Sequence, residues 1–408
     1  MNARQHMKTQ SHNRMRWLTL FGTIVTQFAL GSVYTWSLFN SPLADKLHQP
    51  VSQVAFAFGL LSLALAVASS VAGKFQDRFG VRNVTLGAGL LLGIGFCLTA
   101  YASNLVMLWV CAGLLVGFAD GIGYLMTLSN CVKWFPERKG VISACAIGAY
   151  GLGSLGFKYI NSQLLAHYSL ERTFELWGLI AMLMVIAGGL LMKDAPAQQT
   201  IKTRAVRDFS LAECIRMPQY WLLAMMFLTA CMSGLYVIGV AKDIGESLVH
   251  MSPLAAANAV TIIAVANLGG RLVLGVLSDR MSRIRVISLA QVVSLVGMVS
   301  LLFTHLSPVL FFMSIACIAF SFGGTITVYP SLVSDFFGLN NLTKNYGVIY
   351  LGFGIGSIIG SIVASLFGGF LATFHLILVL LIVSLIISLT LRKPGEKSAM
   401  KLQTAIHN

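Results

Sequence analysis

The sequence predicts an all-α membrane protein with twelve transmembrane helices in two pseudo-symmetric halves of six. The first observation is composition: hydrophobic residues make up 57% of the 408-residue chain and charged residues only 10%, whereas soluble domains carry about 25% charged residues. The second is the length of the apolar runs, which are near the ~20 residues that a helix needs to cross a bilayer. The third is an internal repeat at an offset of 202 residues. Helices are expected because lipid offers backbone groups no hydrogen-bond partners.

Twelve apolar runs follow one another along the chain. In order, they are residues 17–39, 52–73, 83–102, 105–129, 141–165, 174–192, 218–240, 254–276, 286–305, 308–331, 347–371 and 373–391. A polar, basic head precedes the first run, and Pro218 starts the seventh. We therefore expect a cytoplasmic N-terminus, a first six-helix half, a central cytoplasmic loop, a second six-helix half and a cytoplasmic tail, at residues 1–16, 17–192, 193–217, 218–391 and 392–408.

The repeat joins equivalent loops of the two halves. The loop Gly73-Lys-Phe-Gln-Asp77-Arg78 returns as Gly275-Val-Leu-Ser-Asp279-Arg280. Tyr34 likewise returns as Tyr236. Two equivalent halves in an apolar chain suggest a carrier whose site lies between them.

The net charge of +14 does not indicate a nucleic-acid partner, because most Lys and Arg residues fall on alternate loops. The opposite loops carry only Lys46, Arg172 and Lys242. This asymmetry predicts a multi-pass protein of the bacterial inner membrane with both termini in the cytoplasm. The expected partners are the lipid bilayer and a small organic anion, with the protein functional as a monomer.

No catalytic or metal site is expected. The seven cysteines give no disulfide framework and are interpreted as small packing residues. The histidines fall in outer loops, at an outer helix end and in the tails. Without a nucleophile–base pair or a metal cluster, the sequence favours neither an enzyme nor a cofactor.

Glycines recur at a spacing of four in two of the expected helices, at Gly113, Gly117 and Gly121 and at Gly352, Gly356 and Gly360. Small residues at this spacing let membrane helices approach closely. The denser glycine run of the fifth helix is open to a second interpretation, a surface on which helices slide.

With twelve helices and both G-x-x-x-D-R loops, the chain resembles the major facilitator superfamily, and within it the oxalate:formate antiporter family. The matching segments are Gln27…Gly-Ser-Val-Tyr34-Thr-Trp36, Asn267-Leu-Gly-Gly-Arg271 and Asn345-Tyr-Gly-Val-Ile-Tyr350. The resemblance implies alternating access around a central anion site, built from one or two cationic side chains within an aromatic cage.

Three charged residues lie well inside the expected spans: Lys158, Arg271 and Asp120. Charges in a membrane are costly and usually mark pathways or partners. Arg271 lies roughly 12 Å deeper than Asp279 at 1.5 Å per residue, and its planar group can bind a carboxylate through two hydrogen bonds. The alternative to a substrate-binding role is an arginine near a helix end whose side chain extends to the membrane surface. The resemblance implies that Arg271 is the substrate arginine.

Further substrate-binding residues are expected around Arg271. They are Tyr34, Gln27, Tyr124, Tyr150, Asn267, Tyr350 and Tyr236. Span tyrosines are otherwise typical of membrane interfaces. The resemblance instead implies that four of them line the cavity: Tyr34, Tyr124, Tyr150 and Tyr350.

Two departures from the resemblance bear on the substrate. Phe353 stands where dianion carriers of the family place a lysine, and Asn267 stands where proton-coupled monocarboxylate carriers place an aspartate. A single central arginine favours a monocarboxylate such as pyruvate, lactate or formate, carried by symport or by exchange. The alternatives are an oxalate-type dicarboxylate exchanger with Lys158 as second cation, and a carboxylate sensor that does not transport.

Asp120 has two candidate roles: it couples protons to transport, or it pairs with Lys158, although the two differ in depth by roughly 10 Å. The expected coupled species is a proton or a counter-transported carboxylate. The expected gating residues are Asp77, Arg78, Arg82, Asp279, Arg280 and Tyr329. Asp77 and Asp279 are expected to hold the inward loops in the outward-open state, and Tyr329 to close the cytoplasmic side.

Overall fold

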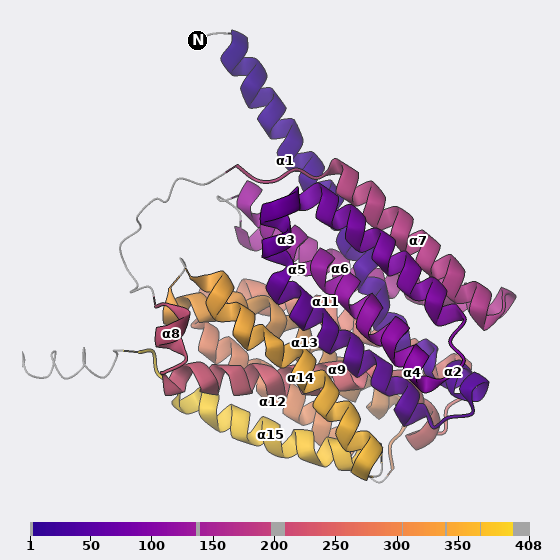
Figure 1. The fold of residues 1–408 in the computed structure, drawn as a ribbon. Helices are drawn as coiled ribbons and strands as arrows, with labels where there is room; N and C mark the ends of the chain where they lie inside the picture. The colour runs from indigo at the N-terminus through magenta and orange to yellow at the C-terminus, as the bar shows by residue number, and fades with distance from the viewer. Residues whose placement is uncertain are drawn as a thin grey trace, which may run out of the picture.

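The computed structural model describes residues 3–135, 139–196, 209–303, 305–338, 341–367 and 369–394, and these contain helices and no strand. The first half contains α1 (Ala3–Leu30), η1 (Gly31–Leu38), α2 (Asn40–Leu47), α3 (Val51–Ala100), α4 (Leu105–Leu108), η2 (Trp109–Leu115), α5 (Val116–Trp134), α6 (Lys139–His167) and α7 (Leu170–Leu191). The second contains α8 (Leu211–Cys214), α9 (Pro218–Leu248), α10 (Pro253–Ala256), α11 (Asn258–Arg280), α12 (Arg283–Leu301), α13 (Pro308–Phe337), α14 (Leu342–Phe367) and α15 (Phe370–Thr390). Figure 1 shows the halves in indigo to magenta and in pink to yellow.

Within the described residues, eleven helical stretches are long and apolar enough to cross a membrane. The twelfth crossing is contained in α3, which is 50 residues long and breaks at Gly80 (φ 77°, ψ 157°). At 1.5 Å per residue such a helix is more than twice the ~30 Å hydrocarbon thickness. Gly80 provides the turn because a positive φ is open to glycine at little cost. The predicted twelve-helix fold is therefore confirmed.

The ends of the chain differ in part from the expected segments. The first helix begins at Ala3 and projects beyond the bundle (Figure 1), because the polar residues ahead of the first apolar run contain no proline or glycine to stop it. The expected central loop contains the short helix α8, which starts with a capping box between Ser210 and Glu213. Residues 197–208 of that loop and residues 395–408 of the tail lie outside the described residues.

The glycine rows pack helices against each other within each half. A Cβ on Gly117 or Gly121 of α5 would lie 2.3 Å or 2.2 Å from a carbonyl oxygen of α3. In the second half, Gly352, Gly356 and Gly360 of α14 face α9. These contacts confirm the packing interpretation, because any larger side chain would push the helices apart.

A further repeated segment, Tyr150-Gly-Leu-Gly-Ser154 in the first half and Phe353-Gly-Ile-Gly-Ser357 in the second, makes the same kind of helix contact in both halves. Gly153 of α6 faces the carbonyl oxygen of Phe28, and Gly356 of α14 faces the carbonyl oxygen of Leu228. Tyr150 and Phe353 precede these glycines by three residues in the two halves. The repeat therefore places one aromatic ring from each half, Tyr150 and Phe353, at the central cavity.

Candidate functional site

The centre of the protein holds a small cavity of ≈ 10 Å³ between the two halves. Both halves line it, with residues Tyr34, Leu65, Tyr124, Tyr150, Arg271, Ile326, Tyr350 and Phe353. This room is about that of one water molecule. Binding of an organic anion there requires the halves or the side chains to move apart.

Arg271 is the cation of this cavity. It is only 2% exposed, so it is not an arginine that reaches the membrane surface. Its Nε donates to Oδ1 of Asn267 at 2.6 Å, and its Nη1 donates to the carbonyl oxygen of Ile147 at 3.1 Å. Both acceptors are neutral, and no ion pair among the described residues includes Arg271. The guanidinium charge is thus available to an anion.

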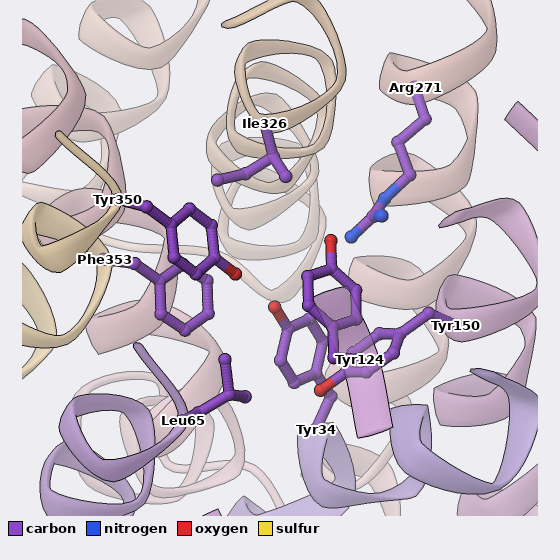
Figure 2. A pocket seen from close by; sticks show the side chains of 8 residues that line it. All are labelled: Tyr34, Leu65, Tyr124, Tyr150, Arg271, Ile326, Tyr350 and Phe353. Carbon is purple, nitrogen blue, oxygen red and sulfur yellow. The ribbon is translucent and has the colours of Figure 1, made fainter. Parts of the chain in front are cut away.

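Aromatic rings line the same cavity as the guanidinium group, which enters it from one side (Figure 2). From the first half, the ring of Tyr150 meets the edges of Tyr34 and Tyr124 at centroid distances of 5.2 Å and 5.1 Å. From the second half, Tyr350 stacks on Phe353 at 5.3 Å. All five rings are buried, which places them in the cavity wall rather than in an interfacial belt.

Asp120 lies directly behind this ring of tyrosines. Its side chain is fully buried, and its Oδ2 accepts a hydrogen bond from the Tyr150 hydroxyl at 3.0 Å. Its Oδ1 has no hydrogen-bond partner in the described part of the chain. A lining residue of the cavity therefore contacts a buried carboxyl group.

Lys158 does not pair with Asp120 in this structure. Its Nζ contacts Oδ1 of Asn258 at 3.4 Å and lies 4.6 Å from the ring centroid of Tyr159. The pairing that the sequence left open is therefore not formed, because Lys158 finds a neutral partner in the other half, at the start of α11.

Two residues expected at the substrate lie elsewhere. The Gln27 amide donates to the carbonyl oxygen of Tyr124 at 2.8 Å and to Thr127 at 3.0 Å, so it holds α1 against α5. Tyr236 packs on Phe374 at 6.3 Å and lines a different cavity. Asn267 supports the site through Arg271. A substrate contact of Tyr236 stays a prediction, since Tyr236 is not among the residues that line the central cavity in this structure.

The expected gating loops are not held by their own aspartates here. Asp77, Arg78, Arg82, Asp279 and Arg280 are all exposed. The outward-open contact expected of Asp77 and Asp279 is thus not the arrangement in this structure.

Other carboxylates hold these loops within their halves. Asp194 accepts hydrogen bonds from the backbone N–H of Val81 at 3.1 Å and from Gln76 at 2.9 Å. Asp335 binds Arg283 at 2.7 Å in the second half. The sequence did not identify either acid as a candidate. Each lies in a loop or near a helix end, where acidic residues are common, and neither belongs to a recognisable motif.

Tyr329 makes its hydrogen bond and its ring contact within its own half. It is fully buried, its hydroxyl donates to the carbonyl oxygen of Leu223, and its ring lies 4.7 Å from Phe227. A closing role for Tyr329 stays a prediction.

The sequence also missed a contact that joins the halves at one end of the bundle. Asn40 donates to the carbonyl oxygen of Gly239 and to Oδ2 of Asp243, both at 2.8 Å. Ser41 approaches Asp243 at 3.4 Å and Glu246 at 3.5 Å. We call the end formed by Asn40, Ser41, Asp243 and Glu246 the Asn40 mouth. It borders a cavity of ≈ 290 Å³ lined from both halves.

Comparisons with known proteins agree with this architecture. The family model described as Major Facilitator Superfamily matches residues 17–248 and 237–405. The chain is 69% identical to an uncharacterized MFS-type transporter, YhjX, of Escherichia coli (strain K12), over 86% of this chain and 88% of that protein. It is 28% identical to the oxalate:formate antiporter of Oxalobacter formigenes, over 82% and 81% of the two chains. It is 23% identical to monocarboxylate transporter 13 of Bos taurus, over 61% and 58%.

Proposed function

Because this chain belongs to the major facilitator superfamily, and is thus a transporter rather than an enzyme, we propose that it carries a small monocarboxylate by alternating access. Arg271 binds the carboxylate, and the tyrosine cage encloses the rest of the molecule. The observation that carries this proposal is the buried, unpaired guanidinium of Arg271 at the contact between the halves.

Arg271 is placed so that an anion can influence both halves. It belongs to α11 of the second half, and its Nη1 donates to Ile147 of α6 in the first half. An incoming carboxylate competes with that carbonyl oxygen for the same N–H group. Binding therefore changes a contact between the halves, as a carrier requires.

The charge of the cavity supports a monocarboxylate. Among the residues that line it, Arg271 is the one cation, and Phe353 stands in the wall where the resemblance to dianion carriers would imply a lysine. Lys158 does not line the cavity, which removes support for the dicarboxylate alternative. Pyruvate, lactate and formate are the candidates. The names of two relatives, an oxalate:formate antiporter and a monocarboxylate transporter, also refer to small carboxylates, and each includes a monocarboxylate.

We place the protein in the bacterial inner membrane with both termini in the cytoplasm. Most Lys and Arg residues fall on the termini and on the loops of the same side, and such an excess is typical of the cytoplasmic side. The Asn40 mouth then faces outward. The structure has this mouth closed by hydrogen bonds between the halves and the gating aspartates of the other side exposed. This arrangement is the one expected of an inward-facing or occluded carrier.

Counterflow in proteoliposomes tests the proposal. Purified protein is reconstituted in vesicles loaded with unlabelled pyruvate, lactate, formate or oxalate, and entry of the labelled compound is followed. We expect counterflow with at least one monocarboxylate and little with oxalate. Counterflow with oxalate alone, or with none of the four, would contradict the assignment.

A further inference from the structure

The buried carboxyl of Asp120 has a hydrogen bond but no cation. Tyr150 donates to one oxygen, the other oxygen has no partner, and no ion pair among the described residues includes Asp120. An ionised carboxylate in such surroundings loses its hydration without a counter-charge in contact. A proton on Asp120 removes that cost.

Tyr150 connects this carboxyl with the substrate cavity. Its ring lines the cavity together with Arg271, and its hydroxyl contacts Asp120 at 3.0 Å. The other titratable side chains that line the cavity are Tyr34, Tyr124 and Tyr350. The α3 face against α5, which includes Leu61, Leu65 and Ser69, carries no charge. Arg271 is therefore the charged side chain on the cavity side of Asp120.

The charges of the centre can balance in two ways. Without substrate, the positive charge of Arg271, which makes no ion pair with Asp120, partly offsets an ionised Asp120 across the cavity wall. With a monocarboxylate on Arg271, that offset is lost, and the centre becomes neutral again only when Asp120 takes up a proton. Charge imbalance is costly in a low-dielectric interior, so anion binding and proton binding favour each other.

We propose that Asp120 is the proton-binding residue of this carrier and that Tyr150 positions it, so that one proton enters with each monocarboxylate. The proton adds to a carboxylate oxygen of Asp120 and leaves the same oxygen when the anion departs, with no other bond changed. The proposal rests on the proposed function and names its coupling ion.

Proton uptake on binding is the decisive measurement. Pyruvate and lactate are titrated calorimetrically into the purified full-length protein, in buffers of different ionisation enthalpy, near neutral pH. We expect uptake of about one proton per bound anion by the native protein, and near zero by Asp120→Asn with binding retained. Between the pH at which Asp120 ionises in the substrate-free protein and the higher pH at which it ionises with the anion bound, affinity should fall by up to about tenfold per pH unit in the native protein only.

The matched control is Asp243→Asn, which neutralises the other deeply buried carboxyl, at the Asn40 mouth. It should still take up about one proton per anion. In proteoliposomes, Asp120→Asn should exchange labelled substrate but lose accumulation driven by a pH gradient, and Tyr150→Phe should show a smaller proton uptake at the same pH.

Binding without proton uptake by the native protein would overturn the proposal, whether or not any variant folds. Undiminished uptake by Asp120→Asn, or its loss in Asp243→Asn instead, would overturn it as well. Absence of binding by either acid would count against the proposed function and not against this inference.

Discussion

The side-chain amide of Asn40, in the first half, donates a 2.8 Å hydrogen bond to the Asp243 carboxylate of the second half. Both residues are at most 1% exposed. The bond lies where the first and seventh membrane helices end, at equivalent places of the two halves. It must break for the Asn40 mouth to open, so its strength sets part of the balance between the two conformations of the carrier.

Replacing Asn40 with alanine should favour the conformation in which this mouth is open. The variant leaves Asp243 without its closest donor, which costs the closed form about 1–3 kcal/mol and raises the open population by about tenfold or more. The measurement is the rate at which a membrane-impermeant maleimide labels Ser52→Cys, which lines the adjacent cavity. The rate is taken as the increase over protein without Ser52→Cys, because native Cys145 is exposed.

The matched control for the mouth is Asn83→Ala. Asn83 is exposed and donates only within its own helix, to the carbonyl oxygen of Phe79. Equal labelling in the native protein, Asn40→Ala and Asn83→Ala would show that Asn40 does not hold the mouth closed.

Replacing Arg271 with lysine should reduce substrate counterflow by about 100-fold or more. The charge is retained, but the bidentate contact with a carboxylate and the bond to Asn267 are lost, at about 1.5–3 kcal/mol for each charge-assisted bond. Arg172→Lys is the control, since Arg172 pairs with Glu175 at an exposed helix start. Near-normal counterflow by a folded Arg271→Lys protein would remove Arg271 from the substrate site.

Replacing Phe353 with lysine should allow oxalate to compete, because it adds a second cation to the cavity wall. Monocarboxylate affinity should fall, since the new charge is then unpaired in a buried site. Inhibition of labelled substrate uptake by oxalate is measured in the native protein, Phe353→Lys and Phe353→Leu. The same oxalate inhibition in all three would mean that this position does not set substrate valence.

Replacing Gly31 with alanine should destabilise the protein, whereas Gly151→Ala should be tolerated. A Cβ on Gly31 would lie 1.9 Å from the carbonyl oxygen of Tyr150, but on Gly151 it would meet Leu268 at 3.9 Å. Overpacking against backbone typically costs about 1–3 kcal/mol. Thermal denaturation in detergent compares the two, and equal midpoints would contradict the close helix contact.

Much of the fold was predictable because the signals that define a membrane helix lie within a short stretch of the sequence. Run lengths, Pro218 and the repeated loops each depend on neighbouring residues, and they led to twelve crossings in two halves. The glycine rows also identified packing faces correctly, because their spacing of four alone aligns them on one side of a helix.

The sequence by itself determined the class of the protein, the number of its crossings and the cation at its centre, because a lone arginine in an apolar run has few alternatives. Only the tertiary structure decided which groups meet that cation. It joined Asp120 to Tyr150 rather than to Lys158, moved Gln27 and Tyr236 out of the cavity, and brought Asn40 to Asp243. Those pairs come from segments far apart in the chain, and helix rotation and depth, which no local pattern encodes, determine whether two such side chains touch.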